Sequence, residues 1–445
     1  MQLVLPLTIA SILPQIENFL WGYICFPFVI LFGLFFTLKS RALQIRYLPK
    51  IMHLFFSLFK SNPNSLPGIH PLKVFFTSIG GCIGIGNIVC ICIAIQLGGP
   101  GALFWIWVGG ILGMIMKYNE VFLGIKYRVK NQKHSYDGGP MFFLQKAFST
   151  KTFAYLSAIL LCFYGIEIFM FRVMIDSLSS NWNISRNSIA IILLLAILYA
   201  ASGGIQRVGK ICSAIIPVFI LIYSFMSLWV IVSNFSILPE LFKQIFSHAF
   251  TGHAAIGGFA GSTFLLMAKE GIERGCYSSD IGIGYASIIH SETSFKNPKK
   301  QAALAIFGVF IDNFIICTLS ILLILCTDVW QQNISPDHLI QSALATQFPY
   351  MYIFMPIFIL ILGYSTVIAF YCVGLKCAKF LYPKLGTWFF NFFAILMFLL
   401  FASPKTNTLQ AFAIMQISGG ILLILNFIGM LRLRKDFDYN LNSID

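Results

Sequence analysis

The sequence predicts an all-α polytopic membrane protein with about eleven transmembrane helices, ten of which form two inverted halves of five. Three observations carry this prediction. The composition is strongly apolar, the basic residues gather on one side of the expected membrane, and glycines interrupt two apolar helices at corresponding places in the two halves.

The composition is that of a membrane chain. Of its 445 residues, 58% are hydrophobic and 10% are charged, whereas a soluble domain is about 25% charged. Long apolar stretches recur along the sequence, as in polytopic membrane proteins. The 11 cysteines lie mostly in these stretches and form no CxxC pair, so we expect them to be small apolar packing residues. We therefore expect a single transmembrane domain over residues 1–445.

Hydropathy gives the order of the helices. A helix needs about 20 residues to cross a bilayer. The expected spans lie near residues 18–38, 71–95, 101–117, 152–175, 187–203, 209–233, 253–272, 301–327, 352–375, 386–402 and 407–430.

The basic residues indicate the orientation. If the N-terminus lies outside, 26 of the 30 lysines and arginines fall in inner loops, at inner span ends or in the C-terminal tail, which is a strong positive-inside bias. The exceptions are Arg172, Arg186, Lys243 and Lys405. This distribution accounts for the net charge of +14 without a nucleic-acid partner. The apolar N-terminal run lacks a basic n-region, so we do not expect a cleaved signal peptide.

Glycines interrupt the second and the seventh span. The interrupting residues are Gly80, Gly81, Gly84 and Gly86 in the second span, and Gly257, Gly258 and Gly261 in the seventh. With the first span (18–38) set apart, the interrupted spans open two five-span repeats, 71–233 and 253–430, before an inner tail, 431–445. Five spans per half give opposite topologies, and paired interruptions are typical of secondary transporters with inverted repeats. The alternative is that these glycines permit close helix packing.

A broken helix offers ligands of both signs. The inner arm of the second span ends near Gly80–Ile83 with free carbonyls, and the outer arm begins near Ile85–Asn87 with free N–H groups. Carbonyls suit a small hard cation such as sodium, and N–H groups suit a carboxylate. The Asn87 side chain could brace the break. We expect Gly258 and Gly261 to face the same ligand.

Two adjacent hydroxyls in the ninth span, Ser365 and Thr366, could complete a cation site. The alternative is that they bond carbonyls of their own helix. The sequence therefore predicts that the cation ligands are Gly80, Gly81, Ile83, Ser365 and Thr366. It predicts that the substrate contacts at the break are Gly84, Ile85, Gly86 and Asn87.

Acidic residues within spans suggest a function because their burial is costly. Asp312 and Glu167 are each either a proton relay or a structural hydrogen-bonding group, and Glu167 could pair with Arg172. Glu120 is expected to pair with Lys117 at the inner edge. The sequence contains no GxSxG, HExxH or Walker motif, which argues against an enzyme or an ATP-driven pump.

Several motifs resemble one known family. They are GIGNI (Gly84–Ile88), LGGPGA (Leu97–Ala102), KYNEV (Lys117–Val121), GGPM (Gly138–Met141), GIERGCYSSDIGIGYAS (271–287) and GVFIDNFIICT (308–318). Together they closely resemble the alanine or glycine:cation symporter family, the sodium:alanine symporters, from about residue 18 to 430.

The resemblance implies eleven spans in the cell membrane, an outer N-terminus, and a leucine-transporter-like fold for the last ten spans. It implies import of alanine, D-alanine or glycine with sodium. The substrate carboxylate would bind at the break of the second span, and sodium would bind between the second and ninth spans.

The sequence also departs from the family pattern. Ile85 stands where the family has threonine, Met170 aligns with a glutamine that lines the substrate pocket, and Arg172 aligns with an asparagine. The substrate therefore stays open. The alternatives are a proton-coupled or exchange carrier for another amino acid, and an amino-acid sensor that does not transport. A monomer would suffice, and the oligomeric state stays open.

Overall fold

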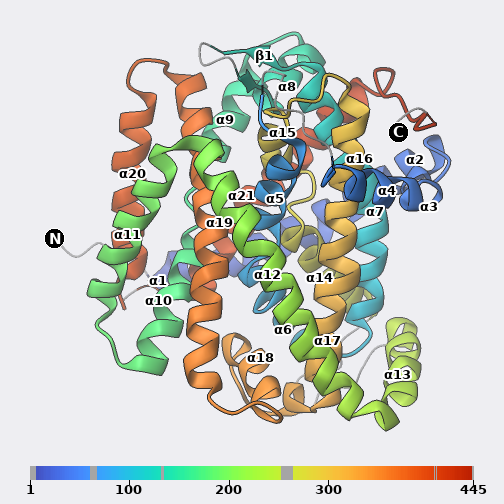
Figure 1. Cartoon of the computed structure of the whole chain (residues 1–445), viewed down its shortest axis with the longest axis vertical. Coiled ribbons are helices and arrows are strands. Elements are labelled where there is room, and N and C mark those ends of the chain that lie inside the picture. Colours follow the sequence, from blue (N-terminus) through green and yellow to red (C-terminus); the bar gives the residue numbers. More distant parts are fainter. Residues whose placement is uncertain are drawn as a thin grey trace.

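The computed structural model describes residues 7–60, 68–131, 135–251, 264–404, 406 and 408–442, and it is almost entirely helical (Figure 1). The chain begins with α1 (Leu7–Phe19), the π-helical segment η1 (Leu20–Cys25), α2 (Phe26–Lys39), α3 (Leu43–Arg46) and α4 (Leu48–Ser57). In the first predicted repeat, the elements are α5 (Pro71–Cys82), the 3-10 turn η2 (Ile85–Asn87), α6 (Cys90–Gly98), α7 (Ala102–Lys126), β1 (Val129–Lys130), β2 (Tyr136–Asp137), α8 (Pro140–Phe148), α9 (Thr152–Tyr164), α10 (Ile168–Trp182), α11 (Arg186–Ser202) and α12 (Gly204–Ser233).

The second half follows the turn η3 (Phe235–Ile237) and α13 (Leu238–Thr251). Its elements are α14 (Phe264–Ser278), α15 (Tyr285–His290), α16 (Pro298–Val309), the π-helical segment η4 (Phe310–Cys317), α17 (Thr318–Cys326), η5 (Val329–Gln331), α18 (Pro336–Ala345), α19 (Met351–Leu381), α20 (Gly386–Ala402) and α21 (Thr408–Arg432).

Most predicted spans correspond to helices of suitable length. Among the described residues, seven helices are long and apolar enough to cross a membrane, and an eighth span is formed by α5 and η2–α6 across a 49° bend. The helices α11 and α20 are apolar but shorter. The seventh predicted span, 253–272, lies partly outside the described residues, and α14 continues beyond it to Ser278. The number of crossings and the orientation stay predictions.

The outer faces of several helices carry large exposed apolar side chains, which in a membrane would face lipid. Examples on α11, α12 and α20 are Ile192, Leu195, Leu221, Phe225, Trp388 and Phe392. Polar side chains are instead gathered inside the bundle, where they pair with one another.

Two basic residues that the orientation argument placed at the inner side are buried within α14. Lys269 lies 3.2 Å from Glu270 and 3.4 Å from Glu273, and Arg274 lies 2.9 Å from Glu270. This pairing offsets much of the cost of burying the charges. Arg274 also lies 3.9 Å from Glu17 of α1, so the network joins the first helix to α14.

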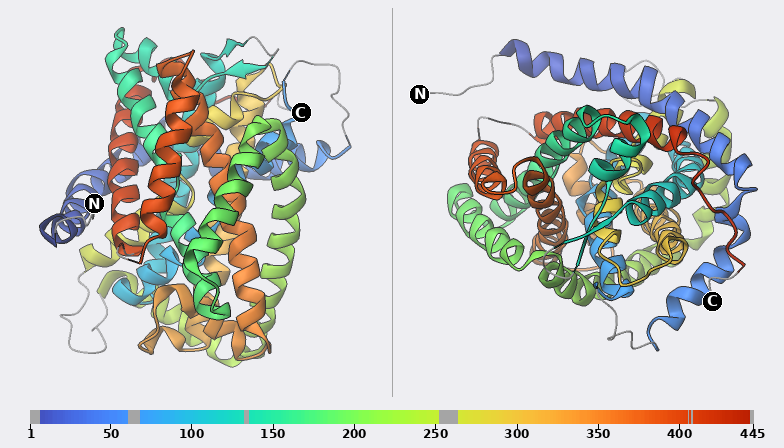
Figure 2. Two further views of the ribbon diagram at one scale, coloured as in Figure 1. Left: turned by 90° about the vertical axis from the view of Figure 1, so that its left-hand side faces the viewer. Right: turned by 90° about the horizontal axis from the view of Figure 1, so that it is seen from above.

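The first long helix lies along the outside of the bundle (Figure 2, right). Trp21 in η1 donates its indole N–H to the carbonyl of Gln416 in α21 at 3.0 Å. Further along, Gly33 of α2 contacts α7 so closely that a Cβ there would lie 2.6 Å from Cβ of Leu112. The glycine therefore sets the distance between α2 and α7.

The segments before α5 and after α15 are bonded to each other at the end of the molecule that carries β1. The N–H of Ile69 donates to the carbonyl of Glu292 at 2.8 Å, and the N–H of Ser294 donates to the carbonyl of Ile69 at 2.9 Å. Lys376 of α19 forms ion pairs with Glu292 and with Asp137 of β2. This end of the bundle is therefore closed by contacts among four elements.

The contact between α2 and α7 gives a first testable prediction. Gly33→Ala should lower the free energy of unfolding by about 1–3 kcal/mol, because the added methyl overpacks against Leu112. Gly22→Ala is the matched control, since a Cβ there meets only the flexible end of Lys269, at 3.8 Å. Thermal unfolding in detergent measures both variants. Equal midpoints for Gly33→Ala and Gly22→Ala would contradict the packing argument.

Candidate functional site

The helix breaks at the glycine-rich stretch of the second span, as the sequence predicts. The inner arm α5 ends at Cys82, and Ile83 leaves the helical conformation with φ −74° and ψ 96°. Gly84 is extended, and the chain then makes the single 3-10 turn η2 before α6 begins at Cys90. The last carbonyls of α5 and the first N–H groups of η2 are therefore left without partners inside their own helices.

The Asn87 side chain braces this break in the way that the sequence suggested. Its Oδ1 accepts a hydrogen bond from the N–H of Gly84 at 3.1 Å. Its Nδ2 donates to Oδ1 of Asp312 at 2.6 Å. The amide thus connects the break to η4, the π-helical segment that contains Asp312.

Asp312 is buried and accepts hydrogen bonds from both halves of the chain. Besides Asn87, its donors are the hydroxyls of Ser278, at 2.9 Å, and Ser279. Three donors hold the carboxyl group in one position and satisfy its oxygen atoms. Of the two roles considered for Asp312, this geometry favours structural hydrogen bonding over proton relay.

A second break lies where α14 ends. The chain is unwound between Ser279 and Gly284, with positive φ at Asp280 (50°), Gly282 (77°) and Gly284 (101°), before it re-forms as the short helix α15. The helix therefore runs past the expected end of the seventh span at residue 272, and the interruption expected in that span was placed at Gly257, Gly258 and Gly261. Those glycines, including Gly258 and Gly261, lie outside the described residues.

The sequence carried a signal for the second break. Residues 82–87 read CIGIGN and residues 280–285 read DIGIGY, so the same IGIG core stands at both breaks. The residues at the second break that the prediction missed are Ser278, Ser279, Asp280, Gly282 and Gly284.

Lys117 of α7 satisfies the carbonyls that the second break frees. Its side chain is 2% exposed, and Nζ donates to the carbonyls of Ser279 and Asp280, both at 2.7 Å. The expected ion pair with Glu120 is therefore wrong. Glu120 instead accepts a hydrogen bond from the N–H of Ser287, just beyond the second break.

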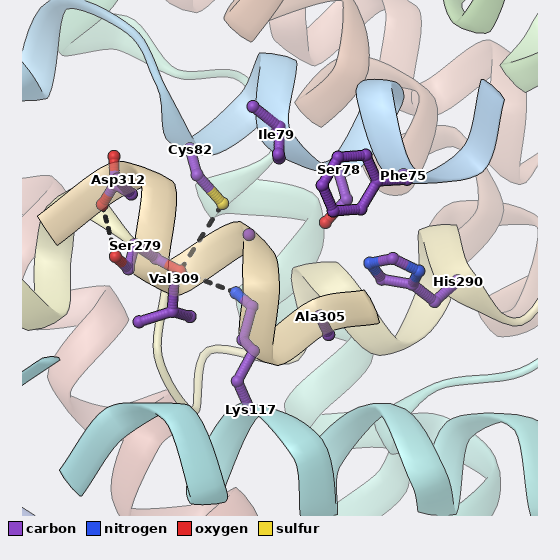
Figure 3. Close-up of a pocket in the computed structure, with 11 residues that line it drawn as sticks. Phe75, Ser78, Ile79, Cys82, Lys117, Ser279, His290, Ala305, Val309 and Asp312 are labelled. Carbon is purple, nitrogen blue, oxygen red and sulfur yellow. Dashed lines mark hydrogen bonds between the residues drawn. The ribbon is translucent and has the colours of Figure 1, made fainter. Parts of the chain in front are cut away.

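A narrow cleft lies beside the two breaks (Figure 3). Cys82, Ser279 and Asp312 lie near one another on one side of it, and Phe75 and His290 lie on the other. The Nζ of Lys117 points between them toward Ser279. The cleft therefore runs between α5 and α16 and reaches the polar groups that hold the breaks.

The two hydroxyls of the ninth span meet the end of α5. Thr366 donates to the carbonyl of Gly80 at 3.0 Å, and the Ser365 hydroxyl lies 3.5 Å from the same oxygen. Ser365 also donates to Leu362 within α19 at 2.8 Å. Thus Ser365 bonds its own helix, whereas Thr366 reaches across to the broken one. A Cβ on Gly84 would overlap the Thr366 hydroxyl.

Gly81 and Ile83 complete the set of expected cation ligands, and Gly81 lies against the second half. A Cβ on Gly81 would overlap the hydroxyl of Tyr285, which donates to the carbonyl of Thr77 at 2.9 Å. Ile83 donates its N–H to Ile79 and is fully buried. The α5 end therefore contacts both α15 and α19.

The expected substrate contacts in η2 face different neighbours. A Cβ on Gly86 would meet Met170 Cε at 3.9 Å and Ser278 Cα at 3.7 Å, which are ordinary contacts. Ile85 is buried, and its side chain packs on α19 at Gly363. Gly86 is therefore buried but has room for a methyl group, and it is faced by Met170 and Ser278.

Arg172 and Glu167 do not pair with each other. Arg172 donates to Asp176 at 3.0 Å, to the carbonyl of Ser403 at 2.7 Å and to the Thr406 hydroxyl at 2.8 Å. It therefore holds the chain just beyond the end of α20. Glu167 lies at the junction of α9 and α10 with φ 53°, and it is 1% exposed.

The model of the sodium:alanine symporter family matches residues 7–442. The chain belongs to this family. It is 31% identical to the uncharacterized transporter YflA of Bacillus subtilis, covering 84% of this chain and 80% of the relative. It is 27% identical to the sodium/alanine symporter AgcS of Methanococcus maripaludis, covering 95% and 94%.

Among solved structures, MhsT in complex with L-phenylalanine matches with a TM-score of 0.57 at 12% identity, covering 81% of this chain and 88% of that one. The likeness shows the fold. The protein is a multi-pass transporter of the cell membrane with a leucine-transporter-type fold.

The role of Asp312 gives a second prediction. Asp312→Ala removes the common acceptor of Asn87, Ser278 and Ser279, and each buried donor left unpaired costs about 1–3 kcal/mol. We expect a markedly lower unfolding midpoint in detergent. Glu240→Ala is the control, because Glu240 forms only an exposed 3.8 Å pair with Lys243 and such pairs contribute little. An Asp312→Ala midpoint equal to that of Glu240→Ala would show that the breaks do not depend on Asp312.

Proposed function

We propose that the protein imports a small neutral amino acid, alanine or glycine, together with sodium. The observation that carries the proposal is the contact between the broken end of α5 and the hydroxyls of α19. The Gly80 carbonyl and the Thr366 hydroxyl lie 3.0 Å apart, and Ser365 lies beside them. Carbonyls at a half-helix end are the usual sodium ligands in transporters with broken helices.

The proposed cation site comprises oxygens only. Its members are the carbonyls of Gly80, Gly81 and Ile83 and the hydroxyls of Ser365 and Thr366. Oxygen ligands suit hard cations such as sodium and exclude softer metals that prefer nitrogen or sulfur. With its hydroxyl turned away from Gly80, Thr366 would present a lone pair to the ion, so binding would exchange a hydrogen bond for coordination.

The proposed substrate site is the other side of the same break. The N–H groups of Ile85 and Gly86 open the outer arm, where a helix has no internal acceptors for them, and such groups bind carboxylates. Gly84 and Asn87 shape this turn through their mutual hydrogen bond. Met170 and Ser278 lie close to Gly86, and this limited space favours a substrate with a small side chain.

Transport would follow from movement of the two repeats, residues 71–233 and 253–430, around this site. Access from the end that carries β1 would require the Ile69 bonds to Glu292 and Ser294 to open. Both breaks belong to a single chain, so a monomer suffices. An amino-acid sensor would bind the same ligand without moving it, and a proton-coupled or exchange carrier would move it without sodium.

Uptake into proteoliposomes tests the coupling. All amino acids are offered with sodium or with choline outside, and we expect alanine or glycine uptake that disappears in choline. Thr366→Ala should raise the sodium concentration needed for half-maximal uptake at least tenfold, while Thr366→Ser, which keeps the hydroxyl, should stay within a few-fold of the wild type. Uptake that is equal in choline would exclude sodium coupling, and binding without uptake would favour the sensor.

A substitution at Gly86 tests the substrate position. Gly86→Leu should abolish uptake, because its side chain would fill the space before Met170 and Ser278. Gly86→Ala is the matched control, since a Cβ meets no heavy atom closer than 3.7 Å, and it should retain measurable uptake. Normal uptake by Gly86→Leu at an unchanged membrane level would show that the substrate binds elsewhere.

A further inference from the structure

We propose that Glu167 is a proton-binding carboxyl group beside the substrate break. Glu167 lies in the junction between α9 and α10, three residues before Met170, which faces Gly86. Asp280 lies in the second break, two residues after Ser278, which faces Gly86 from the other side. Along the chain, the two carboxyl groups thus lie close to the two residues that face Gly86.

Glu167 differs from the other buried carboxylates by its lack of partners. Its Oε2 is buried and has no hydrogen-bond partner among the described residues, and no ion pair involves it there. By contrast, Asp312 accepts three hydrogen bonds, and Asp176 pairs with Arg172 and Arg186. Glu120 accepts one hydrogen bond, from the N–H of Ser287. A bare carboxylate at such a position is strongly disfavoured.

Tyr164 of α9 links Glu167 to the second break. The N–H of Glu167 donates to the carbonyl of Tyr164 at 3.2 Å. The Tyr164 hydroxyl lies 3.4 Å from Oδ1 of Asp280. Oδ2 of Asp280 and the hydroxyl of Tyr277 have no hydrogen-bond partner within the described ranges. Glu167, Asp280 and Tyr277 therefore each have an oxygen atom without a hydrogen-bond partner among the described residues.

No cation among the described residues forms an ion pair with Glu167. The Lys117 ammonium instead bonds the backbone carbonyl of Asp280 at 2.7 Å, and Arg274 pairs with Glu270 at 2.9 Å. A buried carboxylate that no cation neutralises is costly, so we expect Glu167 to take up a proton and become neutral.

The position suggests what the proton does. When Glu167 is protonated, it adds no negative charge beside the position proposed for the carboxylate of the amino acid. When the site opens to the cytoplasm, water would solvate the group, the O–H bond would break, and the proton would leave to water while the carboxylate stays. This last step rests on the proposed transport function. Proton binding itself does not.

Infrared difference spectroscopy tests proton binding without any substrate. The purified protein in sodium buffer is titrated with acid and base, and the C=O stretch of a protonated carboxyl is followed. We expect a band that titrates in the wild type, that is lost in Glu167→Gln, and that returns at a shifted frequency in Glu167→Asp. Glu120→Gln is the matched control and should keep the band. The proposal is overturned if Glu167→Gln, folded by its thermal midpoint, retains the wild-type band.

Transport supplies the second readout. In proteoliposomes at fixed sodium with a trapped pH dye, substrate uptake should move protons inward in the wild type and not in Glu167→Gln, and the pH dependence of uptake should flatten in that variant. Unaltered proton movement in Glu167→Gln would contradict the proposed role. If no amino acid is taken up at all, the proposed transport function fails, while the infrared result still decides whether Glu167 binds a proton.

Discussion

The structure depends on the carboxylate of Asp312. A bilayer has no water to satisfy a broken helix, so two adjacent breaks require donors and acceptors from elsewhere in the chain. The Asp312 carboxylate is such an acceptor: it accepts hydrogen bonds from Asn87 at the first break and from Ser278 and Ser279 at the second. It does so from a π-helical segment, a geometry that is frequent at functional sites.

Other buried polar side chains also satisfy backbone groups at the two breaks. Lys117 donates hydrogen bonds to the carbonyls of Ser279 and Asp280, and Thr366 donates one to the carbonyl of Gly80. One break is therefore stabilised by a fixed ammonium, and the other by a hydroxyl. A hydroxyl can turn to admit an ion, whereas the lysine already provides a charge. This difference explains why we place the exchangeable cation at the first break.

Composition and glycine spacing were enough to predict the helical membrane fold and the bend at Gly84. The adjacent hydroxyls of the ninth span suggested the approach of Thr366 to Gly80, but bonds within their own helix were an equal alternative. The break at Ser279–Gly284 was missed because α14 carries Lys269, Glu270, Glu273 and Arg274. Hydropathy ends a span at such charges, yet in the fold they neutralise one another as ion pairs and the helix continues. The hydrogen-bond partners of buried side chains could also not be predicted from the sequence. Lys117 has Glu120 as its neighbour along the chain, but its partners lie more than 160 residues away.

The central claim is that the two breaks joined by Asp312 form the ligand site. A cryo-electron microscopy map of the protein with sodium and its transported amino acid tests this most directly. The account predicts density for the carboxylate at the N–H groups of Ile85 and Gly86, and density for an ion between the Gly80 carbonyl and Thr366. Ligand density away from both breaks, with the breaks unchanged, would contradict it.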